Sequence, residues 1–307
     1  MSVSNLIFFS MLVLGPFISL TSCSWILCWV GMEISFLGLI PLLLIGNKTL
    51  SKESSMKLFC MQALGSAFIL VGGLVVFSLK GLDSFYAVVI MYGLILKLGL
   101  FPGHFWVISV LFGLDLVSMS VVLGPLKIPP LLFLSEMMMI YPNMSEFMFA
   151  LCGITAIQGA ILGLNQTNTR AMLAASSIVH AGWLGISCVS GSLWVYFSIY
   201  VTSVYFCLSF MWVEDSFSAS LSLLSLSGLP PFFMFLAKFS VIQCLLQNLH
   251  SPMWLILPLL GSVISLVFYL KFFYSYHISS KRNSNLPGLA LGFVILNSGA
   301  VWFFFTG

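Results

Sequence analysis

The sequence contains very few charged residues. Only 6% of its 307 residues are Asp, Glu, Lys or Arg, whereas 60% are hydrophobic. An ordinary soluble domain has about 25% charged residues. The chain also lacks any polar stretch long enough to fold as a soluble domain. These absences exclude a soluble globular protein and indicate a membrane protein. Because apolar runs continue along the whole chain, we expect one transmembrane domain over residues 1–307.

Paired cysteines and cofactor motifs are missing as well. The seven cysteines occur singly, with no C-x-x-C pair, so we interpret them as small core residues. The sequence has no H-E-x-x-H motif, nucleotide-binding loop or hydrolase triad. We therefore expect no metal, no cofactor and no nucleic-acid partner for this chain, and lipids around it. The first 20 residues lack a basic start and contain Pro16, which favours a retained helix over a signal peptide.

Long apolar runs are abundant. A membrane-spanning helix needs about 20 apolar residues, and the runs predict an all-α polytopic membrane protein with about eleven transmembrane helices. We place these helices near residues 4–21, 25–45, 57–79, 85–102, 107–134, 146–164, 171–189, 193–213, 217–247, 252–275 and 288–306.

Two of the runs combine a lysine with a proline break. Lys97 lies in KLGLFPGHFW and Lys238 in SGLPPFFMFLAKF, in the fourth and the ninth predicted helices. An offset of five helices reverses direction, so we expect two inverted five-helix repeats, over about 1–134 and 146–275, each with one discontinuous helix, and an extra C-terminal helix at 288–306. Alternatively, the prolines are incidental, since proline is commoner in transmembrane helices than in soluble ones.

Four ionisable residues lie far from the predicted helix ends. Counted from one end of its segment, Glu33 is roughly 12 Å deep, Lys97 roughly 18 Å and Lys238 roughly 15 Å. A lysine stem extends only about 6 Å, so these charges cannot reach the headgroups. Lys127, flanked by three prolines in GPLKIPP, is also interior but nearer its segment end.

These buried groups allow two interpretations. Glu33 and a lysine could form a static ion pair that conducts nothing. With one acid and three lysines, however, at least two amines lack a carboxylate partner. Burial lowers the pKa of an amine and a nearby carboxylate raises it, so an amine that changes between these two surroundings can take up and release a proton. His180, roughly 14 Å into the seventh helix, could belong to such a relay or be a core histidine. His104, directly after the first break, could be a relay member or a helix-end residue.

The remaining basic residues predict the orientation. Counting alternate sides from the N-terminus, seven of them fall on one side and only Lys80 on the other. Basic residues favour the inner side of a membrane, so we expect the N-terminus on that side and, with eleven helices, the C-terminus on the opposite one. The seven are Lys48, Lys52, Lys57, Arg170, Lys271, Lys281 and Arg282.

Five motifs carry a resemblance to a known family. They are WVGMEISFLGLIPLL at 29–43, KLGLFPGHFWV at 97–107, GLNQTNTRAMLAASSIVHAGW at 163–183, SLSGLPPFFMFLAKF at 225–239 and YLKFFYS at 269–275. Together they resemble the NADH dehydrogenase subunit 2 family, the antiporter-like membrane subunits of mitochondrial respiratory complex I. Many relatives have Pro-Glu where this chain has Ile108 and Ser109, so the role of that glutamate is not carried over.

The resemblance implies a proton-translocating subunit of NADH:ubiquinone oxidoreductase in the mitochondrial inner membrane, with the N-terminus in the matrix and the C-terminus towards the intermembrane space. NADH, FMN, iron–sulfur clusters and ubiquinone would belong to partner subunits, and other membrane subunits of the complex would be its partners. The family's essential glutamate and lysines match Glu33, Lys97, Lys127 and Lys238. Two alternatives stay open: a self-standing cation/proton antiporter, and a structural subunit that conducts nothing.

Overall fold

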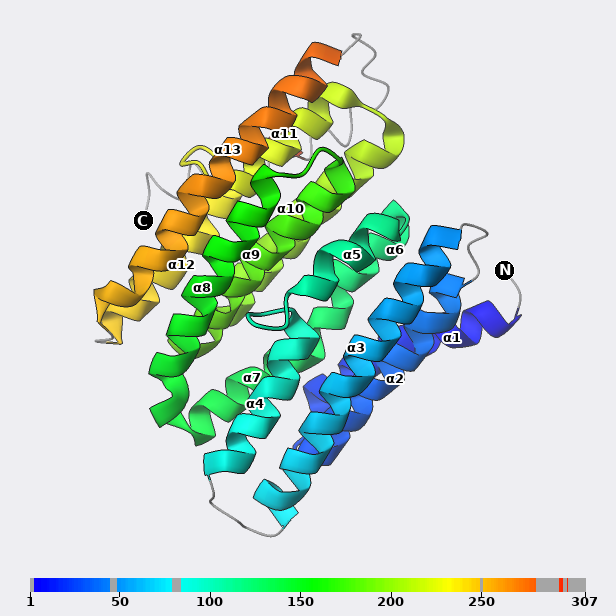
Figure 1. The fold of residues 1–307 in the computed structure, drawn as a ribbon, viewed down its shortest axis with the longest axis vertical. Helices are drawn as coiled ribbons and strands as arrows, with labels where there is room; N and C mark the ends of the chain where they lie inside the picture. The colour runs from blue at the N-terminus through cyan, green and yellow to red at the C-terminus, as the bar shows by residue number, and fades with distance from the viewer. Residues whose placement is uncertain are drawn as a thin grey trace. The chain divides into compact units, whose positions relative to one another are not determined.

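A computed structural model describes residues 3–44, 49–78, 84–248 and 251–279, together with Phe293, Val294 and Asn297. Every regular element in these residues is a helix, as the sequence predicts. Unit 1, Met1–Leu151, and unit 2, Cys152–Gly307, are each compact, and Figure 1 shows the helices within each unit running side by side.

The helices of unit 1 are α1 (Val3–Thr21), α2 (Trp25–Leu44), α3 (Thr49–Gly73), η1 (Leu74–Ser78), α4 (Ser84–Leu98), α5 (Phe105–Gly113), α6 (Leu116–Leu123), η2 (Pro125–Lys127), α7 (Ile128–Ile140) and η3 (Pro142–Met144). α8 (Ser145–Leu164) crosses the division between the units. Unit 2 continues with α9 (Thr169–Ser190), α10 (Leu193–Val213), α11 (Ser216–Ser227), α12 (Phe233–Gln247), η4 (Pro252–Leu255) and α13 (Ile256–Ser279).

Among the described residues, eight helical stretches are long and apolar enough to cross a membrane. Three shorter apolar helices, at 85–98, 216–227 and 233–247, accompany them. The count of eleven stays a prediction, because the helix expected at 288–306 lies outside the described residues except for Phe293, Val294 and Asn297.

Both predicted interruptions are present. The first separates α4 from α5 and contains Gly99, with φ of +72°, and a cis peptide bond between Phe101 and Pro102. The second separates α11 from α12 and starts at Gly228, with φ of +77°. Proline removes a backbone donor and glycine tolerates positive φ, so both residue types end a helix here.

Two predicted boundaries were wrong. The third helix begins at Thr49 rather than 57, because its polar first turns are helical as well; Lys57 pairs with Glu53 one turn away at 2.6 Å. The span predicted at 107–134 begins at Leu116 and ends at Ile140. The residues from Phe105 to Gly113 form the separate helix α5, so the first break lies within an apolar stretch and not at its end.

Small residues bring α1 and α2 together in unit 1. A Cβ at Gly15, Gly31 or Gly38 would lie 2.6–2.7 Å from a carbonyl oxygen of the facing helix. Such close approach is how transmembrane helices gain packing energy without a hydrophobic driving force between them. The opposite face of α1 is apolar and exposed, as at Phe17, which is 60% exposed.

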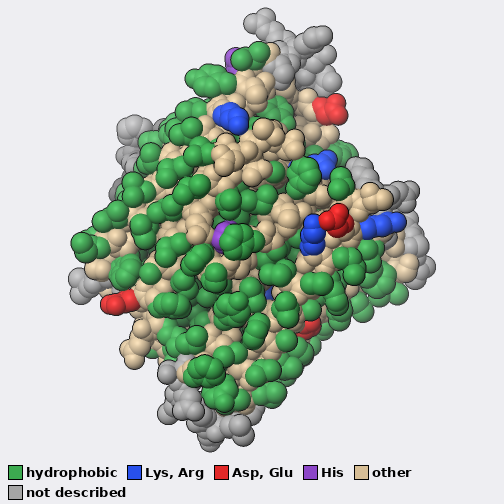
Figure 2. Space-filling model, in the orientation of Figure 1, with side chains coloured by type: hydrophobic (Ala, Val, Ile, Leu, Met, Phe, Trp, Pro, Cys, Tyr) green, Lys and Arg blue, Asp and Glu red, His purple; other side chains and the backbone are tan. Residues whose placement is uncertain are grey.

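In unit 2, α9 is the innermost helix. Of its most apolar stretch 94% is buried, compared with 33% for the span formed by η4 and α13. Its buried serines bond to carbonyls three residues back, as Ser177 does to Ala174 at 2.7 Å. These bonds let hydroxyls enter the interior without an unmet hydrogen bond. On the face drawn in Figure 2, hydrophobic side chains predominate and charged ones are sparse, which suits contact with lipid.

Candidate functional site

The structure brings Glu33 and Lys97 together. The Lys97 Nζ on α4 donates a hydrogen bond to the Glu33 Oε1 on α2 at 3.1 Å. The lysine side chain is 3% exposed and the glutamate 22%. An ion pair so enclosed is costly to form and costly to break, so it either fixes the fold or changes charge during function.

The first helix break surrounds this pair with polar contacts. The Gln62 Nε2 donates to the Lys97 carbonyl at 3.2 Å, and the Trp106 Nε1 donates to the Leu96 carbonyl at 3.0 Å. These donors satisfy carbonyls that the end of α4 leaves without helical partners. A Cβ at Gly65 on α3 would lie 2.8 Å from the Lys97 Cγ, so only a glycine there lets the lysine stem pass.

A small cavity adjoins Lys97. Its volume is about 10 Å³, which is the size that one water molecule needs. Ser35, Gln62 and Lys97 supply its polar lining, while Leu126 and Pro130 close it from η2 and α7. The cavity therefore joins the ion pair to the segment that carries Lys127.

Lys127 itself is buried, at 9% exposure, at the end of η2. This short 3₁₀ turn begins at Pro125 after an irregular residue, Gly124, and it interrupts what would otherwise be one long helix from α6 to α7. The proline-rich segment around Lys127 is therefore not one regular helix.

Lys238 on α12 reaches across the second break. It is 7% exposed, and its Nζ donates to the carbonyl of Ser227, the last residue of α11, at 2.7 Å. The end of a helix carries partial negative charge on its free carbonyls, so it favours an ammonium group. On the other side of the break, the Asn297 Oδ1 accepts from the Phe233 N–H at 3.1 Å, which satisfies a free donor at the start of α12.

His180 lies inside unit 2, at 1% exposure. Its Nδ1 is 3.0 Å from the Tyr196 hydroxyl, and its Nε2 is 3.4 Å from the Tyr269 hydroxyl. Sequence reasoning missed both tyrosines. The only signal for Tyr196 was its spacing of four residues from Tyr200, which places both on one face of α10.

His104 follows the first break and is 2% exposed. Its ring lies 4.1 Å from the Phe105 ring and 6.0 Å from the Phe101 ring, and its Nδ1 has no hydrogen-bond partner among the described residues.

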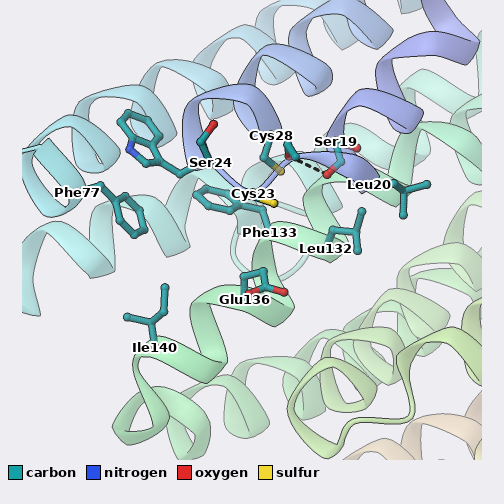
Figure 3. Close-up of a pocket in the computed structure, with 12 residues that line it drawn as sticks. Ser19, Leu20, Cys23, Ser24, Cys28, Phe77, Leu132, Phe133, Glu136 and Ile140 are labelled. Atoms are coloured by element: carbon teal, nitrogen blue, oxygen red, sulfur yellow. Dashed lines mark hydrogen bonds between the residues drawn. The ribbon is translucent and has the colours of Figure 1, made fainter.

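Sequence reasoning also missed a pocket of about 460 Å³ in unit 1. In Figure 3 its lining comes from the turn between α1 and α2, from Phe77 and from α7, which contributes Glu136. Three serines and Glu136 give polar groups to a lining that is otherwise mostly apolar. Cys28, which also lines it, precedes Glu33 by five residues, about 7.5 Å along the α2 axis, so the pocket approaches the ion pair from one end of α2. The described residues contain no group of three metal-binding side chains.

Buried amines beside two helix breaks, in a chain whose described elements are all helices and include many apolar spans, are features of a membrane transporter. Residues 22–218 match the family model described as NADH:quinone oxidoreductase/Mrp antiporter, transmembrane. The chain is 39% identical to NADH-ubiquinone oxidoreductase chain 2 of Albinaria caerulea, over 92% of both chains, and 31% identical to that of Locusta migratoria, over 88% of this chain and 84% of the relative. The chain belongs to the NADH-ubiquinone oxidoreductase chain 2 family.

Solved structures share the fold at lower identity. A chain of respiratory complex I from Thermus thermophilus with bound aureothin superposes with a TM-score of 0.82 at 21% identity, over 97% of this chain and 76% of that one. A chain of the Mrp complex from Dietzia sp. DQ12-45-1b gives a TM-score of 0.75 at 15% identity, over 86% and 58%.

Proposed function

We propose that this chain is a membrane subunit of NADH:ubiquinone oxidoreductase in the mitochondrial inner membrane and moves protons across that membrane. Membership of the chain 2 family supports the assignment to the complex. The observation that carries the proton-transfer role is the enclosed Lys97–Glu33 ion pair at a helix break. A static scaffold has no need for two further buried amines at irregular backbone, because each costs the fold free energy.

In this proposal the relay begins at Glu33 and Lys97, passes Lys127 and His180, and ends at Lys238; His104 is a weaker candidate member. Loss of a proton from Lys97 removes the attraction that holds Glu33, and each change of charge alters how readily the next group binds a proton. The cavity beside Lys97 suits a single bridging water between the ion pair and the Lys127 segment. Inverted repeats over 1–134 and 146–275 belong to the same proposal, supported by the break beside Lys97 in unit 1 and the break beside Lys238 in unit 2.

The energy has to come from elsewhere. Moving one charge against the membrane potential needs about 2.3 kcal/mol per 100 mV, so redox chemistry in partner subunits, which would hold NADH, FMN, iron–sulfur clusters and ubiquinone, must drive the relay through contacts between subunits. The excess of basic residues on one predicted side supports an N-terminus on the matrix side and a C-terminus towards the intermembrane space.

The test replaces Lys238 by Met in the assembled complex, reconstituted into liposomes, and measures protons moved per electron. We expect the ratio to fall while NADH oxidation continues, because the relay loses its last amine. Lys271→Met is the matched control, since Lys271 is exposed and its Nζ donates to the backbone carbonyl of Gln166 at 3.0 Å. A full ratio in the Lys238 variant would favour the structural alternative.

The fold likeness to the Mrp complex keeps a cation/proton antiporter as the second candidate. The two differ in what crosses the membrane. Sodium or potassium flux through the same liposomes in exchange for protons, without NADH, supports the antiporter, whereas proton movement only during NADH oxidation supports the complex I subunit.

A further inference from the structure

His180 is held between two tyrosine hydroxyls that come from different helices. Tyr196 on α10 lies 3.0 Å from one ring nitrogen, and Tyr269 on α13 lies 3.4 Å from the other. All three side chains are at most 1% exposed. Because α9, α10 and α13 all belong to unit 2, the arrangement is internal to one compact part of the chain.

Aromatic packing fixes the orientation of the imidazole. The Tyr200 ring lies 5.0 Å from the His180 ring, and the Trp183 ring stacks on Tyr196 at 6.4 Å with an angle of 10° between planes. The Lys238 ammonium lies 5.9 Å from the centre of the same Trp183 ring. The cluster of three residues, Tyr196, His180 and Tyr269, therefore packs in the same interior as the amine at the second helix break.

Hydroxyl partners suit a histidine that changes its protonation state. A neutral imidazole donates from one nitrogen and accepts at the other, and a tyrosine hydroxyl can do either. Both neutral tautomers are thus fully bonded. The imidazolium donates from both nitrogens, and both hydroxyl oxygens accept after a rotation of their O–H bonds. A carbonyl or carboxylate partner would instead favour one of these states.

We propose that Tyr196 and Tyr269 are proton-transfer residues that act on either side of His180; this inference rests on the proposed function. A proton arriving at the Tyr269 oxygen releases the original hydroxyl hydrogen to Nε2. The Nδ1 hydrogen then passes to the Tyr196 oxygen, whose own hydrogen leaves to the next acceptor. One proton enters and one leaves, and no group ends with a changed charge. The step leaves the ring hydrogen on Nε2 instead of Nδ1, in the other neutral tautomer, which the two hydroxyls bond equally well.

The test compares Tyr196→Phe and Tyr269→Phe in the reconstituted complex. Each keeps the ring and removes only the hydroxyl. We expect protons per electron to fall to the value of Lys238→Met in both. Tyr205→Phe on α10 and Tyr274→Phe on α13 are matched controls, because their side chains are 39% and 59% exposed; both should keep the full ratio.

A double-variant comparison separates proton transfer from packing. If Tyr196 acts through His180, Tyr196→Phe combined with His180→Gln lowers the ratio no further than His180→Gln alone. If a tyrosine hydroxyl has only a structural role, its removal should reduce the amount of assembled complex and leave the number of protons moved per electron in each assembled complex unchanged.

The two proposals fail differently. If Lys238→Met lowers the ratio and either assembled tyrosine variant keeps it, the tyrosine inference is overturned while the proposed function stands. If Lys238→Met keeps the full ratio, the proposed function is overturned, and the tyrosine inference falls with it.

Discussion

At the scale of the residue, the two partners of the buried ion pair differ in exposure. The Lys97 side chain is 3% exposed and that of Glu33 is 22%. Removing one partner of a buried pair leaves the other charge without compensation. The more enclosed ammonium therefore suffers more from this loss than the less enclosed carboxylate.

This difference predicts an unequal pair of substitutions. Glu33→Gln should destabilise the fold by about 3–5 kcal/mol, since it leaves the ammonium without its carboxylate, whereas Lys97→Met should cost only about 1–3 kcal/mol, because the remaining carboxylate is the less enclosed partner. The temperature at which assembled complex is lost on native gels measures the ranking. Equal losses, or a larger loss for Lys97→Met, would contradict it.

Depth counted along the sequence identified the ionisable residues but not the two tyrosine hydroxyls that lie beside His180. Lys97, Lys127, Lys238 and His180 are all buried as predicted, because apolar runs fix depth to within about a turn. Tyr196 and Tyr269 could not be found this way. A tyrosine in a membrane helix is ordinary at many depths, and only the packing of three helices brings these two to one imidazole.

At the scale of the element, the helix breaks position the amines. Gly228 has φ of +77°, and a Cβ there would lie 2.8 Å from the Lys238 Nζ. Proline and glycine in the sequence predicted where the helix stops. They could not predict that the Lys238 Nζ donates a hydrogen bond to the carbonyl of Ser227, because that bond depends on how α11 and α12 pack.

Gly228→Ala should therefore displace Lys238 in addition to straining the backbone. Gly191→Ala is the matched control: its φ is +84°, so it carries similar strain, but nothing lies within 4 Å of a Cβ there. We expect both variants to lose about 1–2 kcal/mol of stability, and only Gly228→Ala to lower protons moved per electron. The same ratio in both variants would show that the contact with the ammonium is unimportant.

At the scale of the whole molecule, each compact unit contains a helix broken by proline and glycine beside a buried lysine, Lys97 in unit 1 and Lys238 in unit 2. The sequence predicted two repeats with this feature, from proline and lysine placed five helices apart. If protons follow one route through both units, the two lysines act in series. If each unit conducts by itself, they act independently.

The measurement that separates these cases compares Lys97→Met, Lys238→Met and the double variant for protons moved per electron in liposomes. One relay predicts that each single substitution lowers the ratio by the same amount and that the double variant lowers it no further. An unchanged ratio in either single variant, or losses that add in the double variant, would contradict a single relay through both units.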